Sequence, residues 1–530
     1  MPETKDTFSR LEEEVRQAFS RLGAEDVKIA TLLSRMSLSP LETMLMNDCK
    51  TWYGDGRVKY HPISVMKAFI LKELKGIRSN AQLIGHLRRH DDERRLIGFS
   101  DAYKTPCQQM LSTTANERMT PEIREVINFI VDRIRVVARE EGRLLDIDFI
   151  PERGNGKKKS KSTIDRAKSE EGGRTIRFLR EEVFPTINLP LGTKARYGKD
   201  NFLDLLAYVA YNNTFANQGY QLMREEGRFR RVPHGTTMLG YLRKLSQEEI
   251  LDMYIAAFDR VFRIAKGRGL MEGQVDLAID FHDWLYYGDK TDKMVVGGEP
   301  KNGTTNRFRF ITIKIAEKHG DFTLLALPVG VFTNQRDAVK TLIEFAKERV
   351  RPRYFYIDRG FYSAKFISLF EELGIKYLMP GVKTKRVLRV MENHPAPAVV
   401  TVNMRSSDGR YQTRTSIAVK KDDDGKDVCF ATNLPPLLLY SANLFELYGK
   451  RWNIETGYRV KKHEFRPNTT SKNHKIRLFY FMFSVLLYNL WVIMNAILSK
   501  YLFGEVVNRR LITAKMFMKK FYEAYTMYSP

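Results

Sequence analysis

The chain has 530 residues, and its 88 lysines and arginines exceed its 63 aspartates and glutamates, which gives a formal charge of +25. Hydrophobic residues make up 43% of the sequence, enough for packed cores, so a largely disordered chain is excluded. Only three cysteines occur, far apart, which excludes a disulfide scaffold and a thiolate zinc site and suits the cytoplasm. The charge favours a polyanionic partner, nucleic acid first and an anionic membrane surface second.

Residues 1–145 are predicted to form a helical DNA-binding domain. Apolar residues recur at helical spacing over 63–77 and 120–142. The stretch between these two helices is rich in arginine, which indicates either a DNA-facing helix or a solvated charged face. The arginines concerned are Arg78, Arg88, Arg89, Arg94 and Arg95.

Residues 146–270 are predicted to form a basic linker followed by a second helical module. The stretch 151–175 is rich in glycine, lysine and serine, a composition typical of a mobile linker whose lysines can follow a phosphate backbone. Helical spacing of apolar residues returns over 200–265.

The periodicity changes from helical to β near residue 275. The run 275–280 predicts a buried strand that ends in Asp280, and alternating strands follow over 307–317 and 322–330. Helices and strands then alternate: a helix over 337–350, a strand over 354–358 ending in Asp358, a helix over 363–373 and a strand over 375–381. Three antiparallel strands followed by helix-linked parallel strands are the order of a ribonuclease-H-like α/β domain, assigned here to 271–383.

A β-rich insertion is predicted over 384–438, before the second part of the α/β core in 439–530. Two alternating runs around an Asp-Gly turn in 399–419 predict a hairpin. The last part of the chain is predicted to be helical over 442–462 and again near 511–526.

Residues 478–498 carry no charge, and this run is long enough to span a membrane. Ser484, Asn489 and Asn495 interrupt it, and the rest of the sequence has the pattern of a water-soluble protein. We therefore expect a buried helix of a large core, with no membrane as partner.

Three acidic residues form the candidate catalytic set. Asp280 and Asp358 end predicted strands, and side chains at strand ends project into the crevice of an α/β sheet. With Glu455 they make an all-oxygen site, which suits Mg²⁺ or Mn²⁺, and two such ions can drive in-line phosphoryl transfer. Other acidic residues lie in competing positions: Asp148, Asp276, Asp283 and Asp289. His282, beside Asp280, is either a ligand or a neighbour of the ligands.

The most specific signal surrounds Glu455. On a helix of about 100° per residue, Tyr448, Arg451, Glu455 and Lys462 fall on one face. This combination suits a metal-binding carboxylate flanked by cations that hold phosphates, whereas a structural surface helix more often carries salt-bridge pairs opposite an apolar stripe.

Over 275–500 the sequence resembles a DDE transposase of the insertion-sequence-4-type group, which is marked by this Tyr-Arg-Glu-Lys signature. DLAIDFHDW resembles the strand of the first aspartate, and YIDRGFYSAKFISLFEELGIKYLMP resembles the block of the second. The group is prokaryotic, so the resemblance implies a cytoplasmic, nucleoid-associated enzyme.

The resemblance also implies roles for the candidate residues. Asp280, Asp358 and Glu455 would hold two Mg²⁺ or Mn²⁺ ions, Arg451 and Lys462 would grip DNA phosphates, and Tyr448 would contact the same strand. Such an enzyme cleaves double-stranded DNA at transposon ends and joins the 3′-hydroxyls to target DNA, as a homodimer on paired ends. A non-catalytic DNA-binding protein derived from a transposase and a structure-specific nuclease with the same core are the alternatives.

Overall fold

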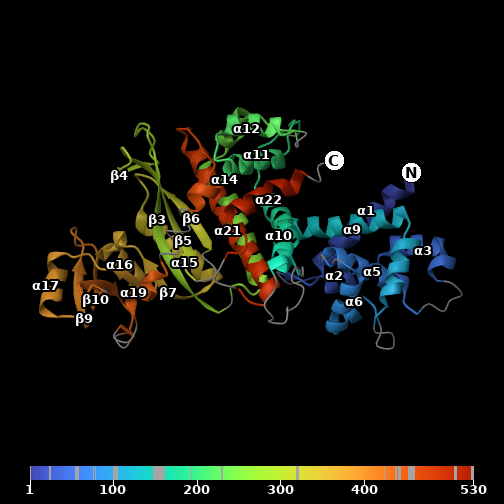
Figure 1. Cartoon of the computed structure of the whole chain (residues 1–530), viewed down its shortest axis with the longest axis horizontal. Coiled ribbons are helices and arrows are strands. Elements are labelled where there is room, and N and C mark those ends of the chain that lie inside the picture. The colour runs from blue at the N-terminus through green and yellow to red at the C-terminus, as the bar shows by residue number, and fades with distance from the viewer. Residues whose placement is uncertain are drawn as a thin grey trace. The chain divides into compact units, whose positions relative to one another are not determined.

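A computed structural model gives two compact units, Met1–Glu152 and Arg153–Pro530 (Figure 1). It describes all residues except 1, 23–25, 54–58, 76, 78, 100–104, 142, 147–160, 193, 228–230, 272, 318–321, 423, 436–437, 440–442, 452–459, 507–509 and 527–530. The finer domain boundaries expected from the sequence stay predictions.

The first unit is helical, as the sequence predicts. Its helices are α1 (Pro2–Ser20), α2 (Ile29–Ser34), α3 (Ser39–Asn47), α4 (Cys49–Trp52), α5 (Pro62–Leu74), α6 (Asn80–Arg89), α7 (Asp91–Leu96), α8 (Gln108–Thr113) and α9 (Pro121–Glu140), with the π-helical turn η1 (Thr114–Arg118). The helices expected over 63–77 and 120–142 are confirmed as α5 and α9. A short parallel pair that the sequence did not reveal, β1 (Asp26–Val27) and β2 (Leu144–Leu145), joins the two ends of the unit.

Buried charges hold α5, α6 and α7 together. Lys75 Nζ lies 3.1 Å from Glu93 Oε1, and His86 Nε2 lies 2.8 Å from Glu93 Oε2. Arg94 is also buried, where its guanidinium donates to Asp91 Oδ1 and to the carbonyl of Phe99. Arg94 is therefore used inside the unit and does not line a DNA-facing surface.

The other arginines of that stretch divide into two groups. Arg88, Arg89 and Arg95 are exposed, so the DNA-facing interpretation stays a prediction for them. Arg78 lies outside the described residues.

Helices also cover much of the second unit. They are α10 (Lys161–Val183), α11 (Lys199–Tyr211), α12 (Ala216–Glu225), α13 (Gly235–Lys244), α14 (Gln247–Gly267), α21 (His474–Phe503) and α22 (Ala514–Thr526), with the short 3₁₀ turn η2 (Phe184–Thr186). The prediction of a linker over 151–175 is wrong from Lys161 onward, because α10 occupies that part. Ile176, Leu179 and Val183 are buried there, and α10 packs against α21 and α22.

The apolar segment 478–498 lies within α21, which crosses the second unit and is buried along nearly its whole length (Figure 1). Among the described residues it is the one helix long and apolar enough to cross a membrane, and its most apolar window is completely buried. The expectation of a buried core helix is confirmed. Its polar groups are paired: Asn489 Oδ1 accepts from Thr323 N at 3.0 Å, and Asn489 Nδ2 donates to Thr323 O at 2.8 Å.

Nine described strands form one mixed sheet. They are β3 (Gln274–Leu285), β4 (Val295–Lys301), β5 (Thr304–Ile315), β6 (Thr323–Val329), β7 (Arg351–Ile357), β8 (Tyr377–Pro380), β9 (Ala398–Arg405), β10 (Gln412–Lys421) and β11 (Asp427–Thr432), in the order β4-β5-β3-β7-β8-β11-β10-β9 with β6 also beside β5. β3, β5 and β6 are antiparallel, whereas β7 and β8 run parallel to β3. Helices α15 (Gln335–Arg349) and α16 (Ala364–Glu372) connect the parallel strands, as expected.

The sheet differs from what the sequence led us to expect at three points. Asp280 does not end its strand, because β3 continues to Leu285 through pairing with β5. β4 was not foreseen, since its residues VVGGEPK lack an alternating pattern. A separate β subdomain over 384–438 is not confirmed: the expected hairpin appears as β9 and β10, but β11 pairs with β8 and so joins these strands to the main sheet, beside α17 (Lys385–Asn393).

Candidate active site

Asp280 and Asp358 lie side by side in the centre of the sheet. β3 and β7 are parallel with Ile279 opposite Ile357, so the two aspartates follow at the next position of neighbouring strands, which run about 4.8 Å apart. β7 ends at this point, and Asp358 caps the 3₁₀ turn η3 (Arg359–Phe361), where its Oδ2 accepts from Gly360 N at 3.2 Å. The end of β7 thus opens the sheet beside Asp280, although β3 itself continues.

Arg451 joins the two carboxyl groups. Its Nη1 donates to Asp280 Oδ2 at 3.0 Å, and its Nη2 lies 3.8 Å from Asp358 Oδ1. The residue Arg451 is 8% exposed, and Asp280 is 9% exposed. The structure brings these three residues together and places Arg451 on the carboxylates. Its expected contact with DNA phosphates stays a prediction.

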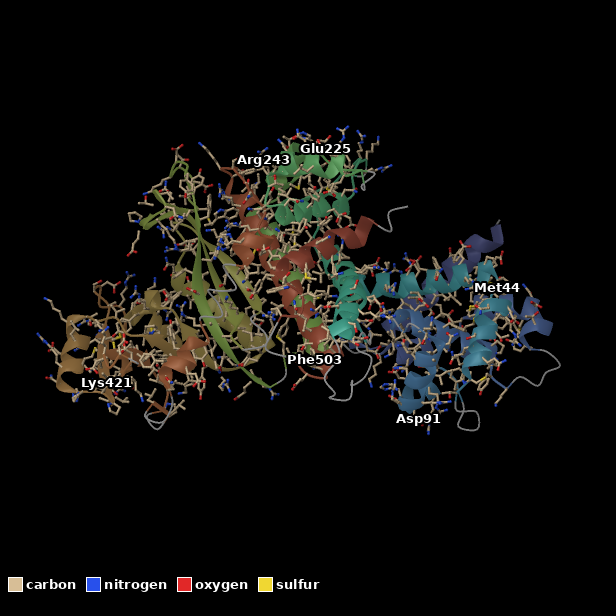
Figure 2. All side chains as sticks on the ribbon, in the orientation of Figure 1. Met44, Asp91, Glu225, Arg243, Lys421 and Phe503 are labelled. Atoms are coloured by element: carbon tan, nitrogen blue, oxygen red, sulfur yellow. The ribbon has the colours of Figure 1, made fainter. Side chains whose placement is uncertain are left out.

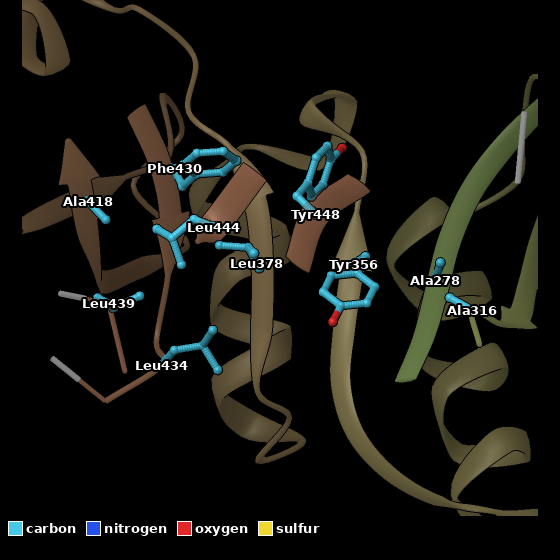
Figure 3. Close-up of a cluster of buried hydrophobic side chains, with 10 residues drawn as sticks. All are labelled: Ala278, Ala316, Tyr356, Leu378, Ala418, Phe430, Leu434, Leu439, Leu444 and Tyr448. Atoms are coloured by element: carbon cyan, nitrogen blue, oxygen red, sulfur yellow. The ribbon is translucent and has the colours of Figure 1, made fainter. Parts of the chain in front are cut away.

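Packing of α19 (Leu444–Gly449) brings Arg451 to this place. Leu444 and Tyr448 of α19 belong to a hydrophobic cluster with Leu378 of β8 and Phe430 of β11 (Figure 3). The Tyr448 hydroxyl donates to the carbonyl of Ile357 at 3.3 Å, directly before Asp358. Tyr448 is thus buried in this state, and its expected contact with a DNA strand stays a prediction.

A second ion pair anchors the same segment, and the sequence did not reveal it. Lys450 Nζ lies 2.6 Å from Asp276 Oδ2, and Asp276 also binds Arg353 through two hydrogen bonds and the hydroxyl of Tyr356. Burial alone would raise the pKa of Asp276, but these hydrogen bonds outweigh it and keep the pKa below its ordinary value. Asp276 is fully committed to this network.

The other acidic residues near Asp280 are committed elsewhere or exposed. Asp283 pairs with Arg307 and Arg309, and Asp289 lies on the surface beside Lys472. Asp148 lies outside the described residues. Among the candidates that the structure describes, Asp280 and Asp358 are the pair that shares one site.

The electrostatics of the pair favour a bound cation. Burial raises the pKa of Asp280 to about 6, the neighbouring charge of Asp358 adds to this, and Arg451 and Lys314 oppose it. Lys314 is a fully buried residue of β5 that the sequence analysis did not single out. The one signal for it was a lysine at an inward position of an alternating strand.

His282 lies two residues further along β3, and its ring packs 5.2 Å from that of Phe481 in α21. Burial and the positive charges of Arg466 and Lys461 lower the pKa of His282 to about 3, so the ring is neutral at physiological pH. The described contacts make His282 a packed neighbour of Asp280, which agrees with the second of the two expectations for it, a neighbour of the ligands.

The segment after Arg451 is described only in part. Glu455 lies outside the described residues, so its expected place beside the aspartates stays a prediction. The helix expected over 442–462 appears as α19 and, further on, as the π-helical turn η4 (Lys461–Phe465). Lys462 in η4 is largely exposed. Partial desolvation of its ammonium group and the positive charges of Arg466 and Lys301 lower its pKa.

The donor atoms at this place are of the type that a hard divalent cation prefers. The two carboxylates offer oxygen ligands at one place, and Arg451 supplies positive charge between them. In the described part of the chain, no cluster of three acidic, histidine or cysteine side chains is found. Glu455, the third carboxylate that the sequence predicts, lies outside that part.

A basic groove lies on the outer part of the sheet. It has a volume of about 740 Å³ and lies between α17 and the β9–β10 hairpin, where Arg386, Arg405 and Arg414 line it opposite the single acidic residue Glu371. All three arginines are exposed. The groove is a further candidate site for binding phosphates. The sequence predicted its hairpin but gave no sign of the groove.

Two family models match the chain. Residues 273–490, which include Asp280, Asp358 and α19, match the transposase DDE domain, and residues 23–117 match a transposase domain (DUF772). Among solved structures, the chain is similar to the piggyBac transposase synaptic complex with hairpin DNA, with 13% identity and a TM-score of 0.44 over 70% of this chain and 81% of that chain. No curated protein was found to match.

The matched DDE domain, which contains Asp280 and Asp358 on neighbouring strands, defines the class of the protein as a transposase. Since a second transposase domain is matched in the first unit, the chain is a DDE-type transposase.

Proposed function

We propose that this transposase binds the ends of an insertion sequence, cleaves them by metal-dependent phosphoryl transfer and joins the 3′-hydroxyls to target DNA. The observation that carries the proposal is the placement of Asp280 and Asp358 at adjacent positions of β3 and β7, bridged by Arg451. The strand order and directions of β3 to β8 support a ribonuclease-H-like core, and the Tyr-Arg-Glu-Lys residues support the insertion-sequence-4-type group.

We further propose that Asp280, Asp358 and Glu455 hold two Mg²⁺ or Mn²⁺ ions. Ions held by these carboxylates would supply the activation of an attacking water or 3′-hydroxyl and the stabilisation of the leaving oxygen. Burial of Asp280 and the neighbouring charge of Asp358 both disfavour the ionised form of Asp280, and the positive charge of Arg451 offsets this only in part. On substrate binding, Arg451 and Lys462 then hold phosphate oxygens beside the scissile bond.

The partners follow from this chemistry. The charge of +25 and the exposed arginines of the basic groove support binding of double-stranded DNA, both transposon ends and target. We propose a homodimer on paired ends and a cytoplasmic, nucleoid-associated location, since both ends of a mobile element must be processed together.

The test is strand transfer with a linear duplex that carries the terminal inverted repeats flanking this reading frame. We expect Mg²⁺-dependent cleavage at the repeat ends and joining to a target plasmid. Asp358→Ala and Glu455→Ala should each lower the cleavage rate by about a thousandfold or more, because several kcal/mol of transition-state stabilisation is lost.

The matched control is Asp289→Ala, since Asp289 is an exposed aspartate whose one described contact is to Lys472. DNA affinity, measured by fluorescence anisotropy, should be retained in all three variants. Cleavage unchanged in Asp358→Ala contradicts the proposal. Cleavage without joining would assign the nuclease alternative instead.

A further inference from the structure

The connection between α11 and α12 has the form of a helix-turn-helix. Four residues, 212–215, separate the two helices, and a turn of three to four residues is typical of this motif. Asn213 in the turn has a φ of 50°, which lies in the left-handed region that asparagine tolerates better than most other residues. Asn468 fixes the turn from outside through its Nδ2, 2.8 Å from Asn213 O.

Close backbone approaches hold α12 on two sides. A Cβ added at Gly219 would lie 2.5 Å from Val209 Cγ2 of α11, so only glycine permits this crossing. A Cβ added at Gly235, where α13 begins, would lie 2.6 Å from Asn217 N. The position of α12 is therefore fixed by its neighbours, and α11 below it is buried along most of its length.

The outward face of α12 carries side chains of the types that contact bases in other proteins. Asn217, Gln221 and Arg224 are exposed and follow one another at i, i+4 and i+7, so they lie along one stripe of the helix. Phe215 at its N-cap is 44% exposed. Asparagine and glutamine pair with adenine, arginine with guanine, and phenylalanine contacts the thymine methyl group in the major groove.

Cations flank this face at positions suited to phosphates. Arg231, Arg243 and Lys244 are exposed before and at the end of α13, and Figure 2 shows side chains around Arg243 and Glu225 pointing outward. The acidic residues Glu225 and Glu226 lie at the C-terminal end of α12, and the Tyr208 hydroxyl binds Glu226 at 2.6 Å. They are thus away from Asn217 in the N-terminal turn, where helix-turn-helix proteins contact bases, but they lie beside Arg224, whose Nη1 donates to the Tyr220 hydroxyl at 3.0 Å.

We propose that α11 and α12 form a helix-turn-helix that reads base sequence in the major groove of duplex DNA through Asn217, Gln221 and Arg224. The inference rests on the proposed function, because it names the part of the transposase that recognises its DNA. Residues 199–244 lie outside both matched transposase domains.

The test is selection from a library of duplexes with a randomised central segment, using the full chain without divalent metal. We expect the unchanged protein to enrich one motif. Gln221→Ala should lose the base preference at one position of that motif and bind its best sequence roughly 5- to 150-fold more weakly. Its affinity for a duplex lacking the motif should stay within about twofold, since phosphate contacts remain.

The matched control is Gln335→Ala, a helical glutamine at the start of α15. An unchanged melting temperature of Gln221→Ala excludes unfolding, because the side chain is exposed. If the unchanged protein enriches no motif, or if Gln221→Ala selects the same motif with the same affinity, the inference is overturned. Strand transfer distinguishes the two proposals. If α12 does not read bases, Gln221→Ala still cleaves and joins repeat-bearing DNA as the wild-type protein does, whereas failure of the proposed function abolishes strand transfer by the wild-type protein and leaves motif selection in place.

Discussion

Arg451 lies where a divalent cation would reduce the repulsion between Asp280 and Asp358. The guanidinium therefore acts as an internal counter-ion in the state described. Bound metal has to share the carboxylate oxygens with it or displace it. This relation makes Arg451 the residue at which metal affinity and protein stability are coupled.

We predict that Arg451→Met lowers the stability of the metal-free protein by about 2–4 kcal/mol, because it leaves a buried carboxylate without its partner. The same variant should bind Mn²⁺ about tenfold more tightly, since the ion no longer competes with the guanidinium. Thermal unfolding with and without metal, together with titration calorimetry, measures both effects. Arg351→Met, an exposed position on β7, is the control, and equal Mn²⁺ affinity in all three proteins would refute the prediction.

At the scale of the elements, the basic groove between α17 and the β9–β10 hairpin is distant from the aspartate pair, so its role in DNA binding can be tested apart from catalysis. Five strand spacings separate β9 from β3, so the groove lies about 24 Å from Asp280 along the sheet. This span corresponds to about seven base pairs of duplex DNA.

We expect the triple variant Arg386→Gln, Arg405→Gln, Arg414→Gln to bind a nonspecific duplex more weakly and with a smaller dependence on salt. The slope of log K against log salt concentration should shrink by about 1–3, because each phosphate contact contributes about 0.9. Binding titrations across a salt series measure it. The variant Lys266→Gln, Lys340→Gln, Lys515→Gln removes the same charge from exposed positions on α14, α15 and α22, and an equal change in its slope would show that the groove makes no particular contact.

The stability of the first unit should depend on pH because of the buried network of Lys75, His86 and Glu93. Burial alone would raise the pKa of Glu93, but His86 and Lys75 outweigh it and lower the pKa to about 2. A carboxyl group whose pKa is lower in the folded state stabilises the fold above its ordinary pKa of 4.5, and that stability is lost as pH falls towards 2.

We therefore predict that Glu93→Gln costs the first unit about 3 kcal/mol at neutral pH and that the difference from the unchanged protein narrows below pH 4.5. Urea unfolding at a series of pH values measures this. Asp92→Asn, an exposed position on the same helix, should show neither effect. A constant difference across the pH series would contradict the assignment.

At the scale of the whole molecule, α21 is the element around which the second unit is built, and its polar residues distinguish a core helix from a membrane span. Asn489 satisfies both backbone groups of Thr323 at the start of β6. In lipid, leucine at this position would be more favourable than asparagine.

We expect Asn489→Leu to destabilise the second unit by about 2–4 kcal/mol, because two buried backbone groups lose their partners. Met494→Leu, a buried substitution of similar volume on the same helix, should cost less than about 1.5 kcal/mol. Chemical unfolding in water without detergent compares them. A stabilising effect of Asn489→Leu would contradict a role of this helix in the core.

The order of the central strands and the two aspartates could be predicted, because alternating apolar residues and an aspartate directly after a buried run are local signals. The extent of β3 could not, since its last residues are held by pairing with β5 after β7 has ended. Gly172 and Gly173 suggested a linker, yet Gly172 permits close packing of α10 against Ile512. The Lys450–Asp276 pair joins residues 174 positions apart, a distance at which a single sequence carries no signal.

Lys450 and Arg451, the two consecutive cations that follow α19, bind different aspartates and so constrain the end of α19 independently. Lys450 binds Asp276, and Arg451 binds Asp280, which lies four residues further along β3. If an ion takes the place of Arg451, as proposed, the separate Lys450 contact can still hold the end of α19 on the sheet. We therefore expect the proposed exchange to require rotation of the Arg451 side chain and no undocking of α19.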